Sequence, residues 1–150
     1  KQACAKWDKA AVGRPSPDFK GVDVSGKQMS LRDFRGKYVY IDMWATWCGR
    51  CQKELPFLKK LEEKYKGRNI TFVGLSIDAD KTKWEARVKS GALCGTQLYI
   101  GRGSQFQKDY RISGIPRFIL LDPNGRIVNP DMTRPSSEDT EKILNSQPGL

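Results

Sequence analysis

The chemistry that this sequence can carry is concentrated in two cysteines three residues apart, Cys48 and Cys51. They directly follow an apolar run and open a segment with helical periodicity. The free amides and the dipole at a helix N-terminus favour negative charge, so we expect Cys48 to be the exposed, lower-pKa thiolate. It would attack a disulfide in a partner, and Cys51, more buried and one turn into the helix, would resolve the mixed disulfide. The spacing therefore predicts a pair that exchanges disulfides.

The same spacing also suits a zinc ligand pair or an inert disulfide. A zinc site needs a second ligand pair nearby, but the chain has four cysteines and no histidine. The remaining two, Cys4 and Cys94, are isolated from each other; they could pair, although a buried apolar Cys94 and an incidental Cys4 are favoured. We therefore expect no bound metal. Without histidine, proton transfer near neutral pH falls to thiols, carboxylates, water or lysine.

Length and composition are typical of a single globular domain, because 150 residues can bury a core without staples. No apolar run approaches the length that crosses a bilayer, and the first residues do not resemble a signal peptide. The formal net charge of +10 is spread among acidic residues, with no basic run that carries stacking aromatics. This distribution argues against nucleic-acid binding and favours a solvated basic surface or faster encounter with acidic partner proteins.

Hydrophobic periodicity predicts strands that alternate with helices after a hairpin-like start. The expected strands are 18–24, 38–44, 70–77, 97–100, 117–122 and 127–128. The expected helices are 51–66, 81–90, 104–110 and 136–145, with a short turn over 31–34. Pro56 should kink the first helix because it lacks an amide hydrogen, and Ser136 and Asp139 should cap the last. These elements predict a mixed α/β sheet sandwiched by helices.

Several motifs follow one another along the chain: Val12-Gly13 with Pro17-Asp18-Phe19, the run from Leu31 to Lys37, the run from Val39 to Pro56, Gly114-Ile115-Pro116, and Leu120-Leu121-Asp122-Pro123-Asn124-Gly125. Together they resemble the thioredoxin superfamily, most closely its TlpA/ResA-like, redoxin-type branch, and span residues 12–143. The resemblance implies a thioredoxin-like three-layer α/β/α sandwich over residues 12–150, with a mixed central sheet, an N-terminal β-hairpin extension and a central insertion. Residues 1–11 are expected to form a mobile N-terminal arm.

The resemblance assigns roles to residues around the cysteines. Pro116 matches the family's cis-proline, which, with Ile115 before it, would bind an extended substrate chain. Asp42, six residues before Cys48, matches the buried aspartate that takes a proton from the resolving cysteine. The residues agree with that role, since a carboxyl group buried in an apolar strand should have a raised pKa.

Four other neighbours of the pair receive roles: Glu54 joins Asp42 among the catalytic residues with their division of labour open, Trp47 is assigned to docking, and Gly49 and Arg50 to tuning of the potential. Glu54 matches a glutamate near the disulfide in the TlpA/ResA-like branch, although a solvated helix residue explains it nearly as well. Trp47 is expected to shape the docking surface. Gly49 and Arg50 stand where many relatives have Gly-Pro. A cation beside the thiolates favours the reduced form, which predicts a potential near about −200 mV, above the roughly −270 mV of thioredoxin.

The resemblance implies an enzyme that exchanges disulfides with protein substrates, more as a reductase, outside the cytoplasm in the bacterial periplasm. The chain contains no flavin or nicotinamide motif, so we expect no cofactor and an upstream thiol redox partner that recharges it. A monomer is the default for this fold. An N-terminal segment missing from the sequence would allow membrane anchoring.

Two other classes of function compete with disulfide exchange. A thiol peroxidase resembling the peroxiredoxins would carry threonine and proline before its cysteine, but alignment on Cys48 places Ala45 and Ile41 there. A non-catalytic thioredoxin-fold binding module would have no need for a buried aspartate behind two thiols. Disulfide exchange is therefore the favoured interpretation.

Overall fold

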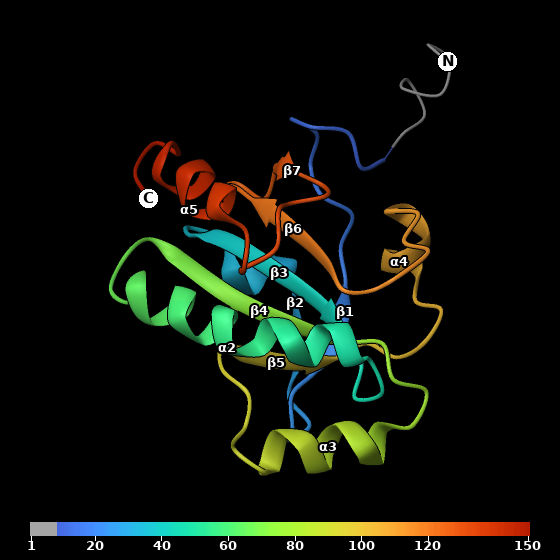
Figure 1. Ribbon diagram of the computed structural model, residues 1–150. Helices are drawn as coiled ribbons and strands as arrows, with labels where there is room; N and C mark the ends of the chain where they lie inside the picture. Colours follow the sequence, from blue (N-terminus) through green and yellow to red (C-terminus); the bar gives the residue numbers. More distant parts are fainter. Residues whose placement is uncertain (1–8) are drawn as a thin grey trace.

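The structure, a computed structural model, describes residues 9–150. A mixed β-sheet lies at the centre of this part of the chain (Figure 1). Its strand order is β2-β1-β5-β4-β3-β6-β7. The strands are β1 (Lys20–Val22), β2 (Gln28–Ser30), β3 (Tyr38–Trp44), β4 (Ile70–Ser76), β5 (Thr96–Tyr99), β6 (Arg117–Leu121) and β7 (Ile127–Asn129). Strands β3, β4 and β5 run parallel, while β6 and the β1–β2 hairpin add antiparallel pairs at either side.

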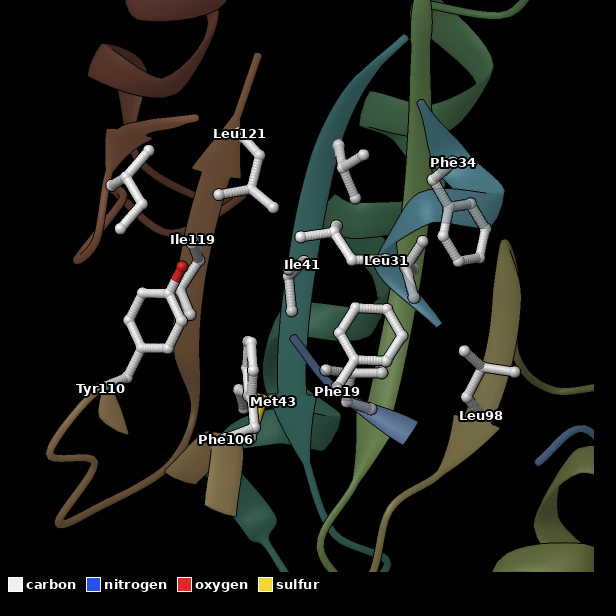
Figure 2. Close-up of a cluster of buried hydrophobic side chains, with 14 of the residues drawn as sticks. Phe19, Leu31, Phe34, Ile41, Met43, Leu98, Phe106, Tyr110, Ile119 and Leu121 are labelled. Carbon is white, nitrogen blue, oxygen red and sulfur yellow. The ribbon is translucent and has the colours of Figure 1, made fainter. Parts of the chain in front are cut away.

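The central strand β3 has both faces covered, which explains its run of β-branched and aromatic residues. Val39, Ile41 and Met43 alternate with the other side chains and point into one core. That core is closed by the 3₁₀ helix η1 (Leu31–Phe34) and α4 (Gln105–Asp109). Figure 2 shows Ile41 and Met43 from β3 among Phe19, Phe106, Ile119 and other side chains of this cluster.

The opposite face of the sheet is covered by α2 (Gly49–Lys64) and α5 (Glu138–Asn145). Tyr38 and Tyr40 of β3 pack there with Leu58 and Leu61 of α2 and with Leu144 of α5. A fourth helix, α3 (Lys81–Lys89), buries Trp84 beside the C-terminal end of β3. Helices therefore cover both faces, and the predicted thioredoxin-like α/β sandwich with its N-terminal hairpin is confirmed.

Three local predictions about the helices are wrong or need adjustment. Helix α2 begins at Gly49, two residues earlier than expected, because the Cys48 side chain caps it. The helix contains Pro56, as expected, and ends at Lys64, two residues earlier than expected. The cap of α5 is Ser137, which accepts the Asp139 N–H at 3.2 Å, because the neighbouring serine, Ser136, is engaged elsewhere.

The N-terminal arm lies partly outside the described residues, and Cys4 with its proposed pairing falls there. Of the part that is described, Ala10 is buried in the core that η1 and α4 close. Among residues 9–150 no helix has the length and apolar character that a membrane span requires.

Candidate active site

Cys48 and Cys51 form a disulfide at the N-terminus of α2. Cys48 occupies the N-cap position, and the backbone N–H of Cys51 donates to its Sγ at 3.1 Å. In the reduced protein the same donor would stabilise a negative charge on that sulfur, as helix N-termini do for anions. The helix start therefore favours Cys48 as the sulfur that carries the thiolate.

The prediction that Cys48 is exposed and Cys51 more buried is wrong, because both residues are buried. Cys48 is 6% exposed and Cys51 is 8% exposed. With the disulfide closed, both residues join a buried cluster with Trp44, Ala45 and Trp84. Asymmetry between the sulfurs must come from their places on the helix.

The loop before Cys48 is fixed by a buried carboxylate that sequence analysis did not identify. Asp78, 1% exposed, accepts hydrogen bonds from the backbone N–H of Thr46 at 3.0 Å and from its hydroxyl at 2.6 Å. The Ser76 hydroxyl donates to the other oxygen of Asp78 at 2.6 Å. On the outer side of the loop, Arg87 of α3 donates to the Thr46 carbonyl at 3.3 Å. Strand β4 and helix α3 thus hold the residues that present the disulfide.

The surface beside the disulfide contains the residues expected to meet a substrate. Trp47 is 69% exposed, which is unusual for a tryptophan, and Gly49 and Arg50 are also exposed. The Ile115–Pro116 peptide bond is cis, as the resemblance implied. Ile115 packs against the cluster that contains both cysteines. An exposed indole and the cis-proline loop therefore lie next to the disulfide.

Asp42 lies on β3, on the face of the sheet that α2 covers, as its alternation with Tyr40 requires. It lines a small cavity, about 20 Å³, together with Cys51. Burial, and secondarily the charge of Glu54, raise the pKa of Asp42 from its ordinary 3.8 to about 7. A carboxyl group with such a pKa exchanges protons readily near neutral pH, and it shares this cavity with Cys51.

Glu54 is buried, so the interpretation as a solvated helix residue is wrong. The residue is 8% exposed, and Ser136, just before α5, donates its backbone N–H at 3.0 Å and its hydroxyl at 2.8 Å to the two carboxylate oxygens. These two hydrogen bonds offset part of the cost of burying the carboxylate. They also place a negative charge near Asp42, the second cause of its raised pKa.

Cys94 lies between α3 and β5 and is not part of the exchanging pair. Burial, and then the neighbouring Glu62, raise its pKa to about 12. A thiol with that pKa stays protonated and unreactive. No cluster of three metal-ligating side chains occurs within residues 9–150.

Three residues of the site have signals of different strength in the sequence. Asp78 follows the apolar run of β4, at the sheet edge where the C-terminal ends of parallel strands meet, which is a recognisable position for a functional carboxylate. Arg87 and Gln97 both line the cavity between Asp42 and Cys51. Nothing in their local sequence marks them, because they reach it through the packing of α3 and the register of β5.

The sequence of this chain is similar to those of known proteins. The model of the family described as Redoxin matches residues 11–146. The thiol-disulfide oxidoreductase ResA of Bacillus cereus is 32% identical over 140 residues, which cover 93% of this chain and 80% of that protein.

Solved structures agree with this relationship. One crystal structure from Bacteroides vulgatus, of a protein assigned to the thiol-disulfide oxidoreductases, is 38% identical, with a TM-score of 0.85 over 95% of this chain and 99% of that one. The thioredoxin domain of another thiol-disulfide oxidoreductase of Bacteroides vulgatus is 31% identical, with a TM-score of 0.80 over 90% and 96%.

Proposed function

Because this chain belongs to the Redoxin family and to the TlpA/ResA-like thiol–disulfide oxidoreductases of the thioredoxin superfamily, we propose that it reduces disulfides of partner proteins outside the cytoplasm, with Cys48 as nucleophile and Cys51 as resolving cysteine. The observation that carries the proposal is the Cys48–Cys51 disulfide at the N-cap of α2. The reducing direction and the periplasmic location rest on the resemblance to the TlpA/ResA-like branch.

The proposed reaction begins with the reduced protein. The Cys48 thiolate attacks one sulfur of the partner's disulfide, and the partner's other sulfur leaves as a thiolate that takes up a proton. Cys51 then loses its proton, and its thiolate attacks Cys48 Sγ. The Cys48–Cys51 disulfide forms and the partner's second thiolate leaves. Two electrons have passed from the cysteine pair to the partner, and an upstream dithiol protein must return them.

Asp42 is the proposed acceptor of the Cys51 proton. Both residues line the 20 Å³ cavity, which has the volume that a single water molecule needs. A pKa of about 7 lets the Asp42 carboxylate accept a proton from the thiol and release it to solvent at neutral pH. Glu54 acts on this step as a positioning residue, because its charge contributes to that pKa.

Substrate contact is assigned to Trp47, Ile115 and Pro116. The exposed indole of Trp47 offers apolar area directly before Cys48, and the backbone beside the cis bond offers groups that an extended chain can pair with. Protein substrates are favoured over small molecules because these features extend beyond the sulfur atoms. The net charge of +10 would hasten encounter with acidic partners.

A peroxidase function gains no support from the site. Ala45, where a thiol peroxidase would carry threonine, is completely buried and brings no hydroxyl group to Cys48. Ile41 points into the core that η1 and α4 close. The hydroxyl group that would polarise a peroxide and the proline that would shape its site are therefore both missing.

The reduction potential of the pair tests the proposal. Oxidised protein is equilibrated with dithiothreitol or glutathione mixtures, and tryptophan fluorescence reports the redox state of the disulfide beside Trp44 and Trp47. We expect one two-electron transition near about −200 mV, above thioredoxin's roughly −270 mV, because Arg50 stands beside the thiolates. Cys48→Ser should abolish the transition. A pair that stays oxidised throughout the series would refute the proposed function, and a value near about −120 mV would make the protein an oxidant.

A further inference from the structure

Three residues on neighbouring strands form a row across the sheet beneath α2. Asp42 of β3 is the register partner of Gly74 of β4, and Gly74 is the partner of Gln97 of β5. Register partners on parallel strands direct their side chains to the same face. The carboxyl group of Asp42 and the amide of Gln97 therefore lie on one face of the sheet. On the strand between them, β4, the residue at this register position is Gly74, which has no side chain.

Gly74 provides the space that the Gln97 side chain occupies. A Cβ at position 74 would lie only 2.8 Å from Cδ and from Nε2 of Gln97, closer than such atoms pack. Gly74 carries no positive φ, so the backbone does not explain the glycine. Its effect is to let the amide of Gln97 fold over β4 towards Asp42.

The amide of Gln97 is held at both ends. Its Oε1 accepts a hydrogen bond from the indole Nε1 of Trp44 at 3.2 Å, and its Nε2 donates to the carbonyl of Cys94 at 2.6 Å. Trp44 packs in the cluster that contains Cys48 and Cys51. Gln97 and Trp44 both line the cavity that Asp42 shares with Cys51. The glutamine thus ties β5 to the wall of this cavity.

We propose that Gln97, seated over Gly74, is a positioning residue for the resolving step: it fixes Trp44 and restricts the cavity between Asp42 and Cys51 to the volume of one water molecule. The inference rests on the proposed function, because the cavity matters only if Cys51 passes a proton to Asp42. Arg87 of α3 and Gln52 of α2 complete the polar lining, and neither hydrogen bonds to Gln97.

Titratable and charged groups lie near Asp42 on each element packed against it. Helix α2 contributes Glu54 and Cys51, helix α3 contributes Arg87, and the segment before β5 contributes Cys94. Tyr40 lies on the same strand, and burial keeps it protonated by raising its pKa. Burial is the main cause of the raised pKa of Asp42, so the residue that limits water in the cavity should control it.

A double-mutant cycle tests the inference through two measurements. The first is the titration of the Asp42 carboxyl carbon by NMR in the oxidised protein, and the second is the pH dependence of disulfide reduction in a protein substrate. Gln97→Ala should admit more water and lower both midpoints by about one pH unit or more, towards the ordinary value for aspartate. Gly74→Ala should do the same, because it expels Gln97 from its place.

The two substitutions should not be additive. With alanine at position 97, a methyl group at position 74 meets no amide, so Gly74→Ala should add little in that background. Gln97→Leu keeps the volume but loses both hydrogen bonds, and should lower the midpoints less than Gln97→Ala. Gln28→Ala, at an exposed position on β2, is the matched control and should change neither midpoint.

The results separate this inference from the proposed function. An Asp42 titration that is the same in wild type, Gln97→Ala and Gln97→Leu would overturn the inference while leaving disulfide exchange intact. Additive effects of Gly74→Ala and Gln97→Ala would also overturn it. Wild-type protein that reduces no disulfide at any pH would instead overturn the proposed function.

Discussion

Replacement of Asp42 by asparagine should stabilise the oxidised protein, and only at pH values where the carboxyl group would ionise. Folding raises the pKa of this group from 3.8 to about 7, chiefly through burial. One pKa unit corresponds to about 1.36 kcal/mol, so ionised Asp42 opposes folding by up to about 4 kcal/mol. Asparagine has a similar shape and carries no charge, and it should remove that cost.

The sign follows from proton binding in the two states. Below about pH 3.8 the carboxyl group is neutral in both the folded and the unfolded chain, so the substitution changes little. Between 3.8 and about 7 the unfolded chain releases the proton first, and the wild type loses stability as the pH rises. Above about 7 the difference reaches its plateau. The gain for Asp42→Asn should therefore be below about 1 kcal/mol at about pH 4 and approach about 4 kcal/mol at about pH 8.5.

Guanidinium unfolding of the two oxidised proteins, followed by far-UV circular dichroism, measures this difference at each pH. Glu63→Gln removes an exposed carboxylate from the same helix that covers Asp42, and should show no pH-dependent gain. An equal gain at both pH values would mean that packing, and not ionisation, distinguishes aspartate from asparagine. A loss of stability above neutral pH would refute the reasoning outright.

Three further substitutions probe the rest of the site. Cys51→Ser should trap a mixed disulfide between Cys48 and the substrate, visible as a covalent adduct by mass spectrometry; turnover without an adduct would contradict the proposed order of attack. Trp47→Ala should lower kcat/KM for a protein substrate about tenfold or more. The free energy of unfolding should change by less than about 0.5 kcal/mol, since the indole is exposed. An equal loss of kcat/KM with a small disulfide substrate would argue against a docking role. Ser136→Ala should destabilise the protein by about 1–3 kcal/mol in denaturant unfolding, because it removes a hydroxyl donor from buried Glu54; an unchanged midpoint would show that this bond contributes nothing.

The sequence was sufficient where the signal is local. The strand before the cysteine pair, the helix after it and the aspartate six residues upstream all lie within the 27 residues from Tyr38 to Lys64. Their chemistry follows from spacing and from the physics of helix ends. The position of Cys48 as the N-cap of α2 agrees with the prediction that the pair lies at the start of a helix.

What the sequence could not show depends on contacts between distant segments. Glu54 meets Ser136 across 82 positions, and no pattern around either residue predicts that pairing. The place of Gln97 over Gly74 depends on the register of two parallel strands joined by a helix. Equal burial of Cys48 and Cys51 also follows from tertiary packing, since Trp84 reaches them from α3.

The burial of the disulfide affects how fast small thiols can exchange with it. Exchange requires a sulfur to approach along a clear path, and here both cysteine residues are buried, at 6% and 8% exposure. A small thiol such as glutathione binds little of the protein surface and gains nothing that helps uncover them. A protein that docks on Trp47 and Ile115, as proposed, would gain contact area as it approaches. Docked proteins should therefore exchange with the pair faster than small thiols do, although small thiols reach the same equilibrium given time.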